Sequence, residues 1–394
     1  MKSIALFMYY MECGGVEMAL VNFLRKIDPL QFHIDLYLVE AKGDFMNIIP
    51  KYVTIKCLKM SDTEKELVIS RQIRHTIKYG IRKKRIVETI SLGCKYALNK
   101  IRKCNFPEYK TVFSDKVGLF PTYDYVLDFH GYLSLTTYLA AYVFRGRSKS
   151  TWIYCEGWID KVVDYRDTFS KFDRIFAVSH TCSDKFNNIL GGNRAEVFYN
   201  FINQDDIIKQ SQVNLPIPVK KESGYIFTTV GRLCVQKGFD LAIKVARIIK
   251  DNNIHFTWFF CGDGSEMEAL KKMVSDYKLT DEIVFVGYTS NPYCFINSCD
   301  IYIQSSRYEG YAVTLMEAVV LKKVIVTTNV SGSEEAVKDG VNGYVTSHDA
   351  KEIAGKIIQL LSDRSKLEQM KVHAASRILV QKESEGLLKE LLIP

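Results

Sequence analysis

Two glutamates in the segment SSRYEGYAVTLMEAV, Glu309 and Glu317, are separated by seven residues and are candidates to bind one ligand together. A glycine follows the first glutamate, and an apolar run typical of a helix carries the second. A carboxylate offers two acceptor oxygens and can accept hydrogen bonds from both hydroxyls of a vicinal diol. The chain contains 45 acidic residues, so this spacing also arises by chance and needs support from the other loops.

Four further loops that follow predicted strands contain residues suited to a phosphate ligand. Near the N-terminus, Gly14 and Gly15 precede a predicted helix, whose first N–H groups and positive dipole end favour a bound phosphate. In a later loop, Arg232 and Lys237 offer a forked guanidinium and a compact ammonium, a pair that suits a diphosphate. Taken alone, the glycine loops also fit ordinary turns, and Arg232 and Lys237 also fit exposed loop cations. The residues that complete these loops are Gly231, Gly262, Gly287 and Tyr288.

The elements that must position these loops are short apolar segments alternating with amphipathic ones, which predicts parallel strands joined by helices. In the first half the predicted strands are Ile4–Tyr10, His33–Val39, Val53–Leu58, Tyr125–Phe129, Ser150–Tyr154, Arg174–Val178 and Glu196–Tyr199. In the second half they are Tyr225–Val230, His255–Cys261, Glu282–Val286, Ile301–Gln304, Val324–Thr328 and Gly343–Thr346. The pattern predicts an α/β protein of two doubly wound domains. In such sheets ligands bind at the carboxyl ends of the strands, where the loops above lie.

A chain of 394 residues is long enough for two domains. We predict an N-terminal domain over 1–205, a linker over 206–223, a C-terminal domain over 224–375 and a C-terminal helix over 376–394 that packs back on the first domain. The ten cysteines form no CxxC pair, which favours reduced thiols over a disulfide framework or zinc site. The N-terminus favours a buried first strand over a signal peptide, and no uncharged stretch reaches the about 18 residues of a membrane span.

The net charge of +8 is concentrated in one segment, 71–103. This segment contains eleven Lys and Arg residues against one acid, Glu88, and apolar residues recur in it at helical spacing. A basic amphipathic helix favours an anionic membrane surface, although a solvated helix face gives the same pattern. Nucleic acid is not expected as a partner, because no nucleic-acid-reading motif is present. The apolar residues concerned are Ile73, Ile77, Ile81, Val87, Ile90, Tyr96 and Leu98.

The order of the motifs along the chain is more specific than any one of them. The sequence contains, in order, GGVE, GRLCVQKG, CGDG, FVGY, SSRYEGYAVTLMEA and NVSGSEEAVKDGVNGYV. This series resembles the retaining glycosyltransferases of family 4, which have the GT-B fold of two facing Rossmann-like domains with a cleft between them. The resemblance covers nearly the whole chain and is densest over 225–345. It implies transfer of a sugar from a nucleotide-diphosphate sugar to a glycan acceptor, such as a lipid-linked one, in surface polysaccharide synthesis.

The resemblance also implies a role for each motif residue, with no metal or other cofactor. Glu317 would accept hydrogen bonds from the ribose hydroxyls, and Glu309 would face the donor sugar. Arg232 and Lys237 would stabilise the negative charge that develops on the leaving diphosphate. Gly310 and the glycine loops listed above would line the donor site. The backbone N–H groups that would meet the diphosphate belong to Tyr311, Ala312 and Val313.

The sequence departs from the family pattern on two points. Ala312 stands where many members have glycine, and alanine allows a narrower range of backbone angles. The acceptor-side histidine of the family is absent from the loop that follows Ser150–Tyr154. Glu156 in that loop is the first candidate to replace it, and His130 is the second, although His130 also fits a structural role. In retention by same-face attack the leaving phosphate can take the acceptor proton, so activity does not require this histidine.

Two functions from different classes therefore remain open. The first is a glycosyltransferase in the cytoplasm, peripheral on the inner face of the cell membrane through residues 71–103. The second is a non-catalytic nucleotide-sugar-binding or scaffolding protein on a degenerate GT-B fold. A sugar-nucleotide epimerase fits the motifs less well. The donor sugar, its base, the acceptor, the linkage and the oligomeric state are not determined by the sequence.

Overall fold

Seven parallel strands form the sheet of the N-terminal domain in a computed structural model of the protein. The structure describes residues 1–12, 14–131, 133–217, 224–310, 312–376 and 382–392. The strand order is β3-β2-β1-β4-β5-β6-β7. The strands are β1 (Lys2–Met8), β2 (Phe32–Leu38), β3 (Val53–Cys57), β4 (Thr122–Asp128), β5 (Arg145–Ile153), β6 (Arg174–Ala177) and β7 (Ala195–Val197). All seven predicted strands are confirmed, and β5 begins five residues earlier than predicted.

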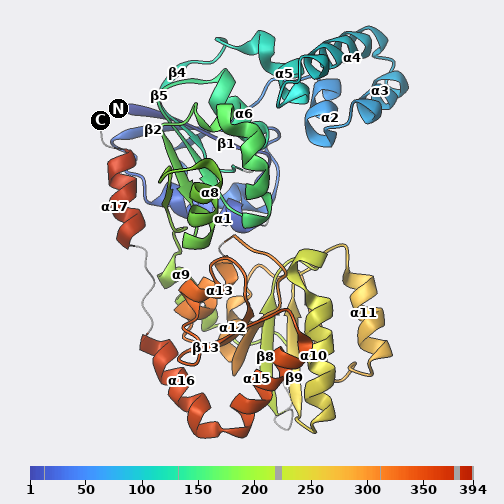
Figure 1. The fold of residues 1–394 in the computed structure, drawn as a ribbon, viewed down its shortest axis with the longest axis vertical. Helices are drawn as coiled ribbons and strands as arrows, with labels where there is room; N and C mark the ends of the chain where they lie inside the picture. The colour runs from blue at the N-terminus through green and yellow to red at the C-terminus, as the bar shows by residue number, and fades with distance from the viewer. Residues whose placement is uncertain (13, 132, 218–223, 311, 377–381, 393–394) are drawn as a thin grey trace.

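A second parallel sheet of six strands, in the order β10-β9-β8-β11-β12-β13, forms the C-terminal domain (Figure 1). Its strands also match the prediction to within one or two residues. They are β8 (Tyr225–Val230), β9 (Phe256–Cys261), β10 (Ile283–Gly287), β11 (Ile301–Gln304), β12 (Val324–Thr328) and β13 (Gly343–Thr346). The two doubly wound sheets confirm the predicted α/β architecture.

Each sheet has an apolar core on both faces because its strands are apolar at nearly every position. Along β1, Ala5 and Phe7 belong to one core cluster, whereas Ile4, Leu6 and Met8 belong to the other, as the alternation of side chains in a strand requires. Helices cover both faces, which is the arrangement expected for all-parallel sheets. The core therefore holds the strand ends, and the loops that follow them, in fixed positions.

The helices that complete the two domains are α1 (Gly15–Arg25), α6 (Leu135–Tyr138), α7 (Arg166–Phe169), α8 (His180–Leu190), α9 (Gln204–Ser211), α10 (Phe239–Asp251), α11 (Met267–Asp276), α12 (Tyr293–Ser298), α13 (Val313–Val320), α14 (Ser333–Ala336), α15 (Ala350–Ser362), α16 (Arg364–Ser376) and α17 (Lys382–Leu391). Shorter 3₁₀ or π turns are η1 (Asp44–Ile48), η2 (Ser114–Lys116), η3 (Leu139–Val143), η4 (Glu156–Tyr165) and η5 (Val235–Lys237). No helix in the described ranges has the length and hydropathy needed to cross a bilayer.

A helical insertion between β3 and β4 projects from the N-terminal domain at the upper right of Figure 1. It comprises α2 (Asp62–Ser70), α3 (Ile73–Arg82), α4 (Ile86–Ile101) and α5 (Pro107–Phe113). Ser61 caps α2 in a reciprocal capping box with Glu64. Gly80 of α3 lies so close to Thr89 of α4 that a Cβ on the glycine would overlap the threonine hydroxyl. The basic segment is thus a tightly packed pair of helices.

Two segments connect the domains. Residues 206–217, assigned from the sequence to a linker, pack on the C-terminal domain, since Ile207 lies in one of its core clusters and Leu215 contacts another. At the other end of the chain, α17 packs against the N-terminal domain (Figure 1). Its Leu388 and Leu391 join the N-terminal core, and Lys26 pairs with Glu385 at 2.7 Å.

Candidate functional site

In the C-terminal sheet the strand order reverses between β8 and β11, and the loops after these two strands meet there. Lys237, in the β8 loop, donates a hydrogen bond of 2.6 Å to the Glu309 carboxylate in the β11 loop. Ser306 donates a second bond of 2.7 Å to the same oxygen, and the Glu309 side chain is buried. Residues 72 apart in the chain thus form one charged pair at the position where open parallel sheets bind ligands.

The loops after β8 and β11 are held together by contacts that restrict movement of the Lys237–Glu309 pair. Gly238 has a left-handed φ of 65°, and a Cβ there would overlap the carbonyl oxygen of Ser305. The Ser305 hydroxyl donates to the carbonyl of Gly238 at 2.9 Å. Arg307 forms a two-pronged ion pair with Asp240, with N–O distances of 2.8 and 2.7 Å. These contacts preorganise the site before any ligand arrives.

Glu317 lies on α13, buried beside the same strand ends. Its carboxylate accepts a hydrogen bond of 3.2 Å from the hydroxyl of Tyr293 on α12. Burial raises the pKa of Glu317 to about 7, and the Tyr293 bond opposes that rise only in part. A carboxylate held in such a desolvated position is a candidate for binding a polar ligand group.

The glycines at the ends of β8, β9 and β10 let these three strand ends approach one another. The Gly231 N–H donates to the carbonyl of Cys261 at 2.9 Å, and the Gly262 N–H donates to Gly287 at 2.9 Å. A Cβ on Gly262 would overlap the carbonyl oxygen of Gly231. Close packing thus accounts for two of the predicted donor-site glycines without a ligand. Tyr288, next in the chain, is 52% exposed.

The N-terminal double glycine faces this site across the domain interface. Gly14 precedes α1 in an extended conformation, and a Cβ on Gly15 would lie 3.6 Å from a methyl group of Val313 at the start of α13. Glu17, one turn into α1, interacts electrostatically with Arg232. Burial raises the pKa of Glu17, and the positive charge of Arg232 partly offsets that effect. Three predicted loops are thus brought together, and Glu17, the last residue of the GGVE motif, joins them without a role having been predicted for it.

A second contact between the domains lies at Gly310. A Cβ on Gly310 would overlap the carbonyl oxygen of Tyr154 in the loop after β5, so the donor loop rests against the backbone of the N-terminal domain. Glu156 begins η4 two residues later, and its side chain is not among those that the structure describes. Tyr311 lies outside the described residues. Ala312 has φ −64° and ψ 103°, an ordinary extended conformation that alanine adopts without strain.

His130 follows β4, which neighbours β1 where the N-terminal strand order reverses. Its ring centroid lies 5.4 Å from that of Tyr9, and its Nδ1 lies 3.3 Å from the Ser134 hydroxyl. Burial lowers the pKa of His130, and the charge of Arg71 lowers it further, whereas Asp128 opposes the shift. The imidazole is therefore neutral near pH 7, so one ring nitrogen can donate and the other can accept a hydrogen bond.

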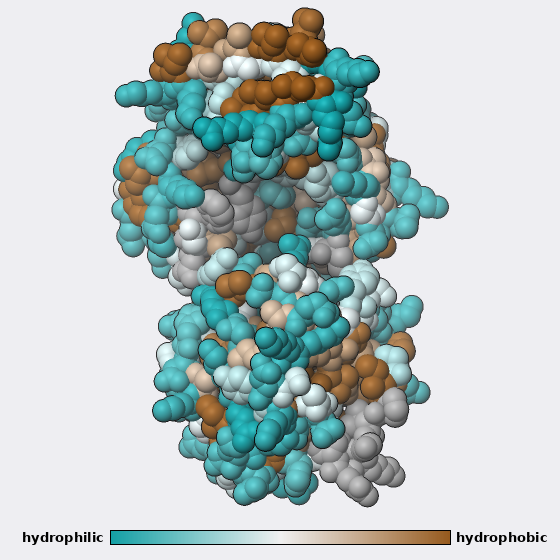
Figure 2. Space-filling view, turned by 90° about the vertical axis from the view of Figure 1, so that its right-hand side faces the viewer, coloured by the Kyte–Doolittle hydropathy of each residue, from teal (hydrophilic) through white to brown (hydrophobic). Residues whose placement is uncertain are grey.

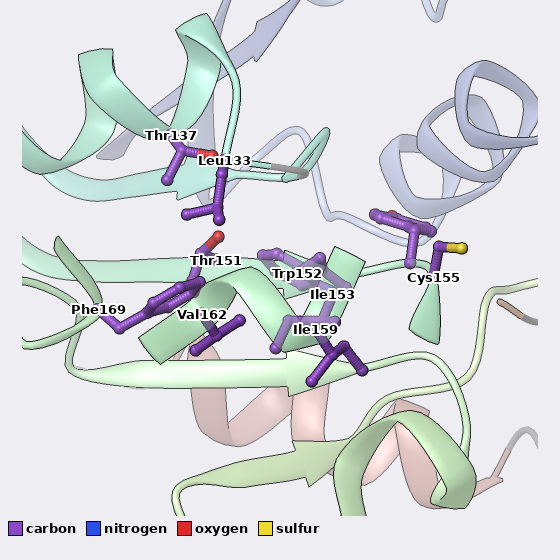
Figure 3. Close-up of a pocket in the computed structure, with 10 residues that line it drawn as sticks. Leu133, Thr137, Thr151, Trp152, Ile153, Cys155, Ile159, Val162 and Phe169 are labelled. Atoms are coloured by element: carbon purple, nitrogen blue, oxygen red, sulfur yellow. The ribbon is translucent and has the colours of Figure 1, made fainter. Parts of the chain in front are cut away.

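A small apolar pocket is formed by β5, the loop that follows it and η4 (Figure 3). One of its lining residues connects to the polar network near the end of β4, since the Thr151 hydroxyl donates to the Asp128 carboxylate at 2.8 Å. Its lining consists of Leu133, Thr137, Thr151, Trp152, Ile153, Tyr154, Cys155, Ile159, Val162 and Phe169.

Residues 211–377 match the family described as Glycosyl transferases group 1. This match spans the C-terminal domain. Over 167 residues the chain is 28% identical to the poly(ribitol-phosphate) alpha-N-acetylglucosaminyltransferase of Staphylococcus aureus, covering 41% of this chain and 34% of that enzyme. The chain thus spans about a third of the length of that relative. It is 24% identical over 368 residues to an uncharacterized glycosyltransferase, MJ1178, of Methanocaldococcus jannaschii, covering 92% and 89% of the two chains.

The whole fold is also similar to those of solved structures. The crystal structure of Anabaena Alr3699/HepE in complex with UDP and glucose superposes with a TM-score of 0.69 at 16% identity, covering 99% of each chain. The S. aureus TarM structure superposes with a TM-score of 0.68 at 14% identity, covering 99% of this chain and 97% of that one. The fold is the predicted GT-B fold.

Proposed function

We propose that the protein is a retaining glycosyltransferase of family 4 that moves a sugar from a nucleotide-diphosphate sugar to a glycan acceptor. The observation that carries this proposal is the Lys237–Glu309 pair at the β8/β11 reversal, opposite the Gly14–Gly15 loop. Relatives named for poly(ribitol-phosphate), O-antigen and capsular polysaccharide transfer support an acceptor in surface polysaccharide synthesis. The HepE complex with UDP and glucose supports a UDP-sugar as the donor.

In the proposed reaction the sugar–phosphate bond breaks and the acceptor oxygen attacks the same face of the sugar. Lys237 and Arg232 stabilise the charge that develops on the leaving diphosphate, a role that fixed cations fulfil without reorganisation. Glu317 binds the ribose hydroxyls, and Glu309 holds the donor sugar while its pairing with Lys237 orients both groups. The leaving phosphate takes the acceptor proton, with the neutral His130 as a second group able to receive it. No metal is part of this proposal.

The helical insertion supports a membrane-linked acceptor. Helices α3 and α4 bury small, polar and apolar residues alike: Thr76, Gly80, Thr89, Leu92 and Asn99. Their outward face carries apolar side chains, visible along the top of Figure 2, with Val87 83% exposed. We name this face the apolar ridge, and it consists of Ile77, Ile81, Ile86, Val87, Ile90, Leu98 and Ile101. An apolar face flanked by Lys and Arg suits an anionic lipid surface.

A substitution of Lys237 tests the catalytic proposal. Lys237→Ala removes the cation from the leaving group, and we expect sugar transfer from a UDP-sugar to fall about 10²–10³-fold. Lys250→Ala is the matched control, because Lys250 forms an ion pair of 2.7 Å with Glu282 elsewhere in the same domain. Transfer or donor hydrolysis is measured by the release of UDP.

The alternative, a non-catalytic nucleotide-sugar-binding or scaffolding protein, predicts a different pattern. Nucleotide sugars would then raise the melting temperature of the protein without being turned over. Neither Lys237→Ala nor Lys250→Ala would change UDP release, because the unmodified chain would release none. A panel of nucleotide sugars scored by thermal shift separates binding from catalysis, since a ligand at 100 times its Kd stabilises by about 2.7 kcal/mol. Turnover that is equal in Lys237→Ala and the unmodified chain would rule out the proposed role of the pair.

A further inference from the structure

Arg71, at the end of α2, is a cation that the donor site does not use. It ends the helix in a left-handed conformation, with φ 54° and ψ 17°, a position that usually favours glycine. Its guanidinium carbon lies 5.4 Å from the ring centroid of Tyr109 on α5. Part of Arg71 is exposed at the surface, while burial against its neighbours partly desolvates the guanidinium.

Tyrosine hydroxyls and a histidine surround this guanidinium at the carboxyl ends of β1 and β4. The Tyr9 hydroxyl lies 3.3 Å from that of Tyr109 and accepts the N–H of Leu135 at 3.1 Å. The Tyr9 ring contacts the His130 ring, and the charge of Arg71 lowers the pKa of His130. We name Arg71, Tyr9, Tyr109 and His130 the Arg71 cluster.

The positive charge of Arg71 differs from those of nearby cations, which form ion pairs with carboxylates. In the same insertion Arg85 pairs with Asp62 at 2.8 Å and Lys95 with Asp115 at 2.5 Å. Within the described ranges, no carboxylate forms an ion pair with Arg71 inside 4 Å. Glu108 acts on Arg71 only electrostatically: its negative charge raises the pKa of Arg71, while burial raises the pKa of Glu108. In the described residues the cluster thus has hydrogen-bond donors and a positive charge without a direct ion-pair partner, at a ligand-binding sheet edge.

We propose that the Arg71 cluster binds a phosphate group of the acceptor. The forked guanidinium matches two phosphate oxygens, and the tyrosine hydroxyls and the neutral imidazole can donate further hydrogen bonds. Arg71 also leads directly into α3, so the site lies at the base of the helix pair that carries the apolar ridge. The phosphate belongs either to a lipid headgroup or to a polyol-phosphate chain. The inference rests on the proposed function, in which the N-terminal domain receives the acceptor.

Binding of phosphate probes to the full-length protein tests the site. UDP is kept at saturation so that the donor site is occupied. Farnesyl phosphate and a glycerol-phosphate oligomer are titrated by calorimetry, with farnesol and glycerol as neutral counterparts. We expect Arg71→Gln to weaken phosphate-probe binding at least tenfold and Arg71→Lys to weaken it less, because lysine keeps the charge without the fork. Arg174→Gln is the matched control, since Arg174 also lies over an aromatic ring, 5.1 Å from the centroid of Phe176, but at the amino end of β6.

The outcomes distinguish a lipid headgroup from a polyol-phosphate chain as the source of the phosphate. They also separate the phosphate site from the proposed function. Arg71-dependent binding of farnesyl phosphate alone identifies a lipid headgroup, and binding of the oligomer alone identifies a polyol-phosphate chain. Equal affinity in Arg71→Gln and the unmodified chain, an equal loss in Arg174→Gln, or no binding of either probe would overturn the inference. UDP affinity and the melting temperature of Arg71→Lys check that the fold persists. The readout needs no sugar transfer, so a protein without turnover still gives a decisive result.

Discussion

At the residue scale, protonation of Glu317 should control nucleotide binding. Only the ionised carboxylate accepts hydrogen bonds from both ribose hydroxyls, and burial raises its pKa to about 7. We therefore expect the affinity for uridine to fall about tenfold for each pH unit below 7 and to level off above it. Uridine carries no phosphate, so calorimetry between pH 5 and 8 reports the protein group. Glu317→Gln should lose this pH dependence, and a slope that persists in the variant would assign it to another residue.

The same carboxylate sets a pH dependence of stability. Its pKa is about 7 in the folded protein against a reference value of 4.5, so the folded state holds an extra proton between these values. The free energy of unfolding therefore falls as pH rises through this window. We expect Glu317→Gln to raise the free energy of unfolding at pH 8 by up to about 3 kcal/mol and to change it little at pH 4. Urea denaturation at both pH values measures the difference, and equal effects at both would contradict it.

Sequence spacing located Glu309 and Glu317 but not their partners. The Lys237–Glu309 pair joins residues 72 apart, and only the parallel order of β8 and β11 places them together. Tyr293 belongs to no motif, and Ser306 stands in one without a predicted role, because any hydroxyl at the right point of a turn or helix can donate to a carboxylate. Arg71 stood in the sequence as one of eleven basic residues, and its contact with Tyr109 depends on a left-handed helix end.

At the element scale, parallel strands were predictable because burial on both faces makes them nearly continuous apolar runs. The start of β5 was missed because its first residues, Arg145 to Lys149, are polar at the edge of the domain. The helix α9 was assigned to a linker because its sequence is mostly polar, and one buried side chain, Ile207, fixes it to the C-terminal domain. The exposed apolar face of α3 and α4 was also not evident, since their periodicity fits either face.

The apolar ridge gives a prediction for α3 and α4 as a unit. We expect Val87→Asn, Ile90→Asn and Ile101→Asn together to lower binding to phosphatidylglycerol vesicles at least tenfold, because three exposed apolar side chains no longer enter the interface. Alanine at Arg82, Lys83 and Lys84 should cost about 1 kcal/mol for each charge removed. Co-sedimentation with phosphatidylglycerol and phosphatidylcholine vesicles measures both effects.

Two controls make the vesicle experiment specific. Val372→Asn changes an apolar side chain that is 69% exposed on the other domain and should leave vesicle binding unchanged. Arg85 is kept, because its pairs with Asp62 and Glu88 support the fold of the insertion. Vesicle binding that is equal in all variants would leave the apolar ridge without a membrane role and would favour a solvated face.

At the scale of the whole molecule, the two domains meet through a few short contacts. The Ser179 and Ser331 hydroxyls lie 2.7 Å apart across the interface, and the His180 N–H donates to Glu335 at 2.6 Å. Gly310 lies directly against Tyr154. Such an interface fixes the distance between the loops of the proposed donor site and those of the proposed acceptor site. Transfer requires this closeness, because attack depends on near contact between the reacting atoms.

Gly310→Ala should therefore separate donor binding from transfer. A Cβ at Gly310 would overlap the carbonyl oxygen of Tyr154, so the domains have to move apart until this contact exceeds about 3 Å. We expect UDP affinity to change less than about threefold, whereas transfer falls about 10²-fold, the loss typical of a misplacement near 1 Å. Gly355→Ala is the matched control, since nothing lies within 4 Å of its added Cβ. Small-angle scattering with UDP should show a larger radius of gyration only for Gly310→Ala, and unchanged transfer in that variant would show that the contact is not needed for the reaction.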